Sequence, residues 1–318
     1  MPRHPTLRQR SLTRATPSAA AWFWRHALSL LRGPRIRLRG WRRLLVDTCR
    51  GLTPEGPQPA DPAERLALSA TEEGVMRAAL GGRAPPLTVL VTCEATNQDL
   101  TVRDLRSVTG RRCWLNDEVM NLYLHLVAKH FTAAGCSVHA MSSFFYAKLA
   151  GDSGIYDFTA VQRWTKRVDL FAQDLVLVPI NHGNTHWTVV AIRPGQRALL
   201  YYDSSRGNDA RRVLQHLITY LRDEHAAKRS AEVALDVSAW RAVVVRDGSP
   251  RQADGCSCGV FALSTAAVLA AHAARARWRG RQGGEEHRAV LPYTQAHVLA
   301  LRARIAVDLL TLRHTALG

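Results

Sequence analysis

The sequence feature that most constrains the fold is a run of sixteen uncharged residues from Gly259 to Ala274. The run is shorter than the ~20 apolar residues that span a bilayer, and it contains Ser264, Thr265 and His272. It predicts a buried core helix, and we expect a soluble protein with no membrane span. Hydrophobic residues make up 47% of the chain, which is enough to surround such a helix.

Two cysteines, Cys256 and Cys258, stand at the start of this run in the stretch QADGCSCGVF. Such a pair is a metal-ligand pair, a redox pair, or a nucleophile with a neighbour. The 318 residues include only six cysteines, too few for the disulfide framework of a secreted domain, so we expect reduced thiols. A disulfide between Cys256 and Cys258 would close a strained small ring.

From about residue 88 the hydrophobic pattern switches between strand and helix spacing, which predicts an α+β domain. In the helix that starts near residue 114, Asn116 or Asp117 is positioned to cap the first turn. The expected strands are 87–93, 174–181, 186–192, 197–203 and 240–245, and the expected helices are 114–131, 213–225, the run after Cys258, and 297–312.

The stretch HWTVVAIRPGQRALLYYDSS predicts a β-hairpin, because Pro194 and Gly195 separate two β-rich runs. A turn centred on these two residues places His186 directly opposite Asp203, where side chains lie about 5 Å apart. A carboxylate beside an imidazole orients one ring nitrogen and leaves the other for a nucleophile. An ordinary cross-strand pair is the alternative, and the Pro-Gly turn is not the favoured hairpin type.

Cys258 precedes Gly259 and the apolar helix, so its thiol lies at a helix N-terminus, where unpaired N–H groups favour the thiolate. Gln252, six residues upstream, is positioned to donate an amide hydrogen to a developing oxyanion. A zinc site formed by His182, His186 and the two cysteines is the alternative. It is disfavoured because one residue between cysteines is shorter than the usual spacing and a strand begins at His186.

Residues 1–85 differ from the remainder and are expected to form a basic, disordered extension with a linker. The first fifty residues hold twelve arginines, and Thr53–Glu64 contains four prolines. A nuclear address and a mitochondrial transit peptide both fit this composition. The net charge of +17 rests on 39 arginines and four lysines, a skew that coding composition also produces, so we do not infer nucleic-acid binding from it.

The chain resembles the Ulp/SENP family of ubiquitin-like-modifier cysteine proteases, which process SUMO and remove it from proteins. The segments that carry the resemblance follow one another in the family's order and cover about residues 90–315. They are WLNDEV (114–119), SSFFY (142–146), VQRWTKRVDLFAQDLVLVPIN (161–181), HW (186–187), YYDS (201–204) and QADGCSCGVF (252–261).

The resemblance implies a papain-like fold over residues 86–318, with a central mixed β-sheet flanked by helices. It also implies a role for each matched residue: Cys258 as nucleophile, His186 as general base, Asp203 as its orienter, Gln252 in the oxyanion hole, Trp114 and Trp187 as indoles over the substrate's Gly-Gly tail, and Asp117 as a contact with the modifier. Cys256 stands where the family usually has another residue, which makes it a spectator.

The function implied is a SUMO-specific isopeptidase, or endopeptidase, that cleaves after Gly-Gly. The implied partners are SUMO or a related modifier and its conjugates. We expect a nuclear, monomeric enzyme that needs no metal, cofactor or nucleic acid. Cytoplasmic location and mitochondrial targeting are the alternatives for its address. The functional alternatives are a protease for a Nedd-type modifier or ubiquitin and, in another class, a binding module without turnover.

Overall fold

The computed structural model describes residues 66–151, 154–229, 235–278 and 291–316. The predicted basic extension therefore lies outside the described residues over positions 1–65. The described residues all belong to one packed unit.

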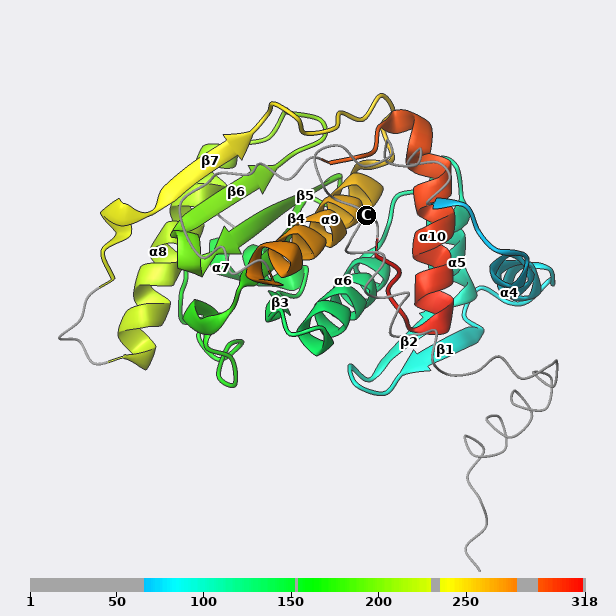
Figure 1. Ribbon diagram of the computed structural model, residues 1–318, viewed down its shortest axis with the longest axis horizontal. Coiled ribbons are helices and arrows are strands. Elements are labelled where there is room, and N and C mark those ends of the chain that lie inside the picture. Colours follow the sequence, from blue (N-terminus) through cyan, green and yellow to red (C-terminus); the bar gives the residue numbers. More distant parts are fainter. Residues whose placement is uncertain (1–65, 152–153, 230–234, 279–290, 317–318) are drawn as a thin grey trace, which may run out of the picture. The chain divides into compact units, whose positions relative to one another are not determined.

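A five-stranded mixed sheet forms the centre of this unit (Figure 1). Its strand order follows the sequence: β3 (Val138–Ala140), β4 (Leu175–His182), β5 (His186–Arg193), β6 (Ala198–Tyr202) and β7 (Arg241–Val245). The two outer pairs, β3–β4 and β6–β7, are parallel, whereas β4–β5 and β5–β6 are antiparallel. The α+β class with a central mixed sheet, predicted from the sequence, is confirmed.

Helices cover both faces of the sheet, which is why the central strands are buried along most of their length. Leu177 of β4 and Val189 of β5 point into a core shared with helices α6 (Asp117–Ala133) and α9 (Cys258–Trp278). The alternate residues Val178 and Val190 point into a second core. This second core is shared with α7 (Phe144–Ala150) and α8 (Ala210–Lys228). The remaining elements are α4 (Ala70–Leu80), β1 (Val89–Cys93), β2 (Gln98–Thr101), α5 (Val102–Thr109), α10 (Val298–Thr311) and the short 3-10 turns η1 (Leu170–Ala172), η2 (Pro194–Gln196), η3 (Val237–Ala239) and η4 (Gln295–His297).

Helix α9 is the predicted core helix, and its residues from Cys258 to Ala271 are buried. Of the helices in the described ranges, it alone is long and apolar enough by composition to cross a membrane, and 78% of its apolar window is buried inside the protein. Contact with the sheet and with neighbouring helices accounts for its apolar surface.

The hairpin between β5 and β6 forms, but its predicted register is wrong by two residues. Paired residues run from Val189–Tyr202 to Arg193–Ala198, because four residues rather than two make the connection. Pro194–Gln196 adopt a 3-10 turn and Arg197 takes the left-handed conformation, with φ of 49°. A shift of two residues leaves every side chain on its original face.

Helix α4 lies before the domain boundary expected at residue 86, and it packs against α10. Arg304 of α10 is buried and forms an ion pair with Glu72 of α4, while its second guanidinium nitrogen donates to Ala67 O at 2.8 Å. Hydrogen bonds from Arg304 and Ser69 lower the pKa of Glu72 to about 2 against the opposing effect of burial. A fragment that begins at residue 86 therefore lacks the partner of a buried cation.

Candidate active site

His186 and Asp203 meet at the end of the β5–β6 hairpin. His186 is the first residue of β5, and Asp203 follows the last residue of β6. Extending the observed register places Asp203 diagonally across from His186 on the same face. The ring Nε2 lies 2.8 Å from Asp203 Oδ1. Since a carboxylate only accepts hydrogen bonds, Nε2 carries the hydrogen and Nδ1 is left for another partner.

The Asp203 carboxylate is held by two residues that the sequence reasoning missed, Ser205 and Asn208. Oδ1 accepts from the Ser205 N–H at 2.8 Å and hydroxyl at 2.9 Å. Oδ2 accepts from the main-chain N–H of Asn208 at 3.2 Å and from its side-chain amide at 3.0 Å. Burial favours the neutral acid, but the hydrogen bonds from His186, Asn208 and Ser205 together hold the pKa of Asp203 well below its ordinary value.

Cys258 is the first residue of α9, and its sulfur interacts with His186 and with the main-chain N–H groups of Trp187 and Gly259. Helix α9 packs closely against Leu115 because residue 259 is glycine: an added Cβ would lie 3.0 Å from the Leu115 side chain. Burial raises the pKa of the Cys258 thiol, but the hydrogen bonds from His186 and Trp187 outweigh it and leave that pKa below its ordinary value. Burial likewise opposes the charged ring, yet the bonds to Asp203 and Cys258 raise the pKa of His186 to about 9.

The loop before Cys258 is organised by Asp254, whose Oδ1 accepts from the main-chain N–H groups of Cys256 and Ser257 at 3.0 and 2.9 Å. Gln252 is tied to Ser204, the residue that follows Asp203. Its Oε1 accepts from the Ser204 hydroxyl at 2.7 Å, and its Nε2 donates to Asp254 O at 2.6 Å. The orientation of the Gln252 amide is therefore fixed.

Cys256 differs from Cys258 in its surroundings. Its buried sulfur lies 3.7 Å from Arg111 O. Burial and the nearby Asp254 carboxylate raise the pKa of its thiol, which keeps it protonated. Both cysteines are free thiols.

The two tryptophans matched in the sequence occupy different environments. Trp114 is 50% exposed, and its indole N–H donates to Gly255 O at 2.8 Å. Trp187 is 4% exposed and donates to Leu115 O at 2.9 Å. Trp114 is therefore the indole available to a bound peptide.

Asp117 begins α6, and its Oδ1 accepts from the Ser143 hydroxyl at 2.7 Å.

His182 faces His186 across the tight β4–β5 turn, with ring centroids 6.3 Å apart. Its Nε2 lies 2.9 Å from the Thr188 hydroxyl, and burial together with the neighbouring His186 lowers the pKa of His182 to about 4. Within the described ranges, no group of three or more His, Cys, Asp or Glu side chains is arranged to hold a metal ion.

Arg302 of α10 connects the segments on both sides of this site, and sequence reasoning gave no sign of it. The residue is 1% exposed, and among the described residues its guanidinium donates to main-chain carbonyls alone. The acceptors are Ser107 O and Val108 O at the end of α5, at 3.1 and 2.9 Å, together with Cys113 O and Cys256 O, at 2.8 and 3.2 Å. One buried cation thus joins the Trp114 segment to the Cys258 loop.

Comparison with known families and proteins finds one family over most of this domain. Residues 113–315 match the model of the Ulp1 protease family, C-terminal catalytic domain. The chain is similar to the ubiquitin-like-specific protease ESD4 of Arabidopsis thaliana, with 37% identity over 205 residues, 62% of this chain and 40% of that protein. It is also similar to sentrin-specific protease 2 of Rattus norvegicus, with 38% identity over 182 residues, 57% of this chain and 29% of that protein. The aligned region is thus less than half the length of each of these relatives.

Solved structures share the fold. The catalytic domain of the Ulp1-like SUMO protease of Chaetomium thermophilum superposes with a TM-score of 0.60 at 27% identity, covering 77% of this chain and 90% of that one. The C-terminal Ulp1 protease domain, solved in complex with Smt3, the yeast ortholog of SUMO, gives 0.58 at 22% identity over 77% and 96%. The helix-flanked mixed sheet is therefore the Ulp1 catalytic-domain fold.

Proposed function

The chain belongs to the Ulp1 protease family, and from that premise we propose that it is a SUMO-specific thiol isopeptidase that cleaves after the modifier's C-terminal Gly-Gly. The observation that carries the proposal is the position of the His186 ring, between the Asp203 carboxylate and the Cys258 sulfur. A thiol with a lowered pKa beside an imidazole that a third group orients is the arrangement that nucleophilic catalysis needs.

In the acylation step, the Cys258 thiolate attacks the carbonyl carbon of the terminal glycine, and the electron pair of the C=O bond moves to oxygen. The Gln252 amide is a donor for this oxyanion, since its contact with Asp254 O uses only one of its two hydrogens. Protonated His186 then gives its Nδ1 proton to the departing lysine amine as the C–N bond breaks, which leaves a thioester.

In the deacylation step, neutral His186 takes a proton from water while the hydroxide equivalent attacks the thioester carbonyl. The C–S bond breaks, the thiolate returns beside the imidazolium, and the modifier leaves with a free carboxylate. Asp203 keeps its charge throughout, because hydrogen bonds from Ser205 and Asn208 hold the pKa of its carboxyl low.

Substrate selection in this proposal rests on Trp114, Trp187 and Asp117. The exposed Trp114 indole covers the Gly-Gly tail, and a larger side chain there would collide with it. SUMO is favoured because the solved relatives named as SUMO proteases share the fold. The region from residue 86 onward also carries 28 basic and 20 acidic residues, which suits an acidic modifier surface. The family's substrates favour action in the nucleus. We also propose that the enzyme acts as a monomer.

The test is covalent labelling by modifiers that carry an electrophile at the C-terminal glycine. The SUMO probe should label Cys258 faster than matched ubiquitin and Nedd-type probes, and raised salt should slow SUMO labelling while barely changing alkylation by a small reagent. Cys258→Ser should abolish labelling and hydrolysis. Equal labelling by all three probes would refute SUMO selectivity. A thiol that alkylates but takes none of the probes would refute the protease in favour of a binding module.

A further inference from the structure

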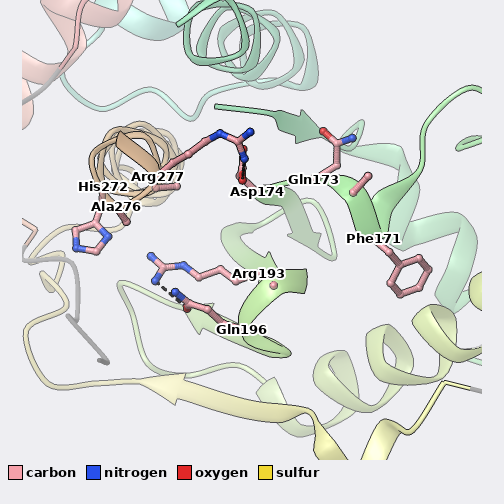
Figure 2. A pocket seen from close by; sticks show the side chains of 11 residues that line it. Phe171, Gln173, Asp174, Arg193, Gln196, His272, Ala276 and Arg277 are labelled. Carbon is pink, nitrogen blue, oxygen red and sulfur yellow. Dashed lines mark hydrogen bonds and ion pairs between the residues drawn. The ribbon is translucent and has the colours of Figure 1, made fainter. Parts of the chain in front are cut away.

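A second cavity lies away from the candidate active site, between α9 and the turn that follows β5 (Figure 2). Its volume is about 240 Å³, room for a small ion or a small organic acid. Residues from four elements line it: Phe171–Asp174 before β4, Arg193 at the end of β5, Gly195 and Gln196 in η2, and His272, Ala273, Ala276 and Arg277 on α9. None of these residues belongs to the site described above.

Arg193 is the unusual group in this cavity. The residue is only 9% exposed, and its Nη1 donates a long hydrogen bond of 3.4 Å to Gln196 Oε1. Its Nε and Nη2 are buried and have no hydrogen-bond partner among the described residues. These two nitrogens form one edge of the guanidinium, the fork that binds two oxygens of a carboxylate or phosphate side by side.

The other charges around the cavity are already balanced. Asp174 Oδ1 accepts from Arg277 Nη1 at 2.6 Å, and Asp174 Oδ2 accepts from the Ser137 N–H at 2.7 Å. Arg277 and Asp174 therefore neutralise each other beside Arg193, as the dashed contact in Figure 2 shows. No carboxylate of the described chain lies within ion-pair distance of Arg193, and burial lowers the pKa of its guanidinium. Within the part of the chain that the structure describes, the buried positive charge of Arg193 is uncompensated.

An uncompensated buried cation costs several kcal/mol, and proteins normally pair such a group or supply it with a ligand. We propose that this cavity is a binding site for a small anion, of the phosphate or carboxylate class, with the free guanidinium edge of Arg193 as its principal contact. The Gln196 side chain lies beside that guanidinium, and Figure 2 shows the His272 ring on the α9 side of the same cavity.

The proposed anion site lies on the same two elements, β5 and α9, that carry His186 and Cys258. Arg193 is the last residue of β5, and His186 is the first, about 23 Å away at ~3.3 Å per residue. His272 lies fourteen residues after Cys258 on α9, about 21 Å away at ~1.5 Å per residue. The anion would thus join the far ends of the two elements that bring the nucleophile and its base together.

The experiment measures thermal melting of the protein in chloride buffer and in rising inorganic phosphate or acetate at constant ionic strength. The native chain should show a saturable rise in melting temperature with at least one of the two anions. A response to phosphate alone would assign a phosphoryl group, and a response to acetate alone would assign a carboxylate. Arg193→Gln should lose the saturable rise, whereas Arg167→Gln, which removes an exposed charge, should keep it.

Arg193→Gln also separates ligand binding from packing. In chloride it should melt at or above the native temperature, because it removes the uncompensated charge. Arg193→Lys keeps the charge but loses the fork, so its apparent affinity should fall at least about tenfold. Isothermal titration calorimetry compares the anion affinities of the same variants without heating. No saturable effect of either anion on the native protein, or the same effect on Arg193→Gln, would overturn the proposal.

Discussion

Replacing His186 with alanine should slow alkylation of Cys258 at pH 7 by about tenfold. Burial is the largest influence on this thiol and raises its pKa, while the His186 interaction outweighs it in the native protein. Without the ring, the thiol pKa returns to its ordinary value of 9.0 or above. A thiol of that pKa is about 1% ionised at pH 7, so the thiolate falls by up to about a hundredfold.

Part of this loss is recovered, because a more basic thiolate is the better nucleophile. A Brønsted slope of about 0.4–0.5 means that the higher nucleophilicity offsets roughly half of the loss on a logarithmic scale, so the net loss should be about tenfold. The pH profiles should differ in form as well. In the variant the rate should rise about tenfold per pH unit up to pH 9. The native rate should change little from pH 7 until His186, whose pKa is raised to about 9, loses its proton.

The assay is iodoacetamide labelling read by peptide mass spectrometry, which separates Cys258 from the exposed Cys113. Cys258→Ser identifies the peptide, and the rate at Cys113 in the same samples serves as the internal control, since His186→Ala should leave it unchanged. Identical pH profiles for the native chain and His186→Ala would refute the thiolate–imidazolium pair on which the proposed mechanism depends.

Four further outcomes follow from the described contacts. Cys256→Ser should change turnover less than about twofold, since its thiol is protonated and lies beside Arg111 O; a loss as large as that of the nucleophile variant would reverse the assignment. Trp114→Ala should lower turnover more than modifier binding and leave the melting temperature nearly unchanged, whereas Trp187→Ala should cost about 3–5 kcal/mol of stability, so equal melting of the two variants would contradict the difference in burial. Asn208→Ala removes a hydrogen bond to a charged group and should lower kcat by about tenfold at unchanged KM; an unaltered kcat would make it a turn residue only. A fragment starting at residue 86 should melt below one starting at residue 66, because Arg304 loses its buried ion pair, and equal melting would show that α4 adds nothing.

The sequence predicted the architecture well where hydrophobic spacing alone decides it. The core helix from Cys258, the strand that begins at His186 and the helix capped by Asn116 all lie where their patterns placed them. The meeting of His186 with Asp203 was also anticipated, although through the wrong register. The prediction survived because an error of two residues preserves the face of a strand, whereas an error of one would have separated the pair.

What the sequence could not provide were contacts made by main-chain atoms and loop conformation. Pro-Gly is compatible with several turns, and the four-residue loop depends on the left-handed Arg197. Ser205 and Asn208 reach Asp203 only because the chain turns sharply after β6. Arg302 has the appearance of an ordinary charged position on an amphipathic helix. Arg304 stands two residues later in the same helix, so the residue type at 302 gave no signal of its own.

The bonding of Arg302 bears on how this enzyme tolerates mutational drift. Every acceptor of its guanidinium is a main-chain oxygen, which each of the twenty amino acids supplies equally. The side chains at positions 113 and 256 can therefore be substituted without changing the spacing between the Trp114 segment and the nucleophile loop. The residue at 302 has no such freedom, because the point charge of a lysine cannot span carbonyls from three segments. In a randomised library selected for turnover, diversity should accumulate at 256 and vanish at 302.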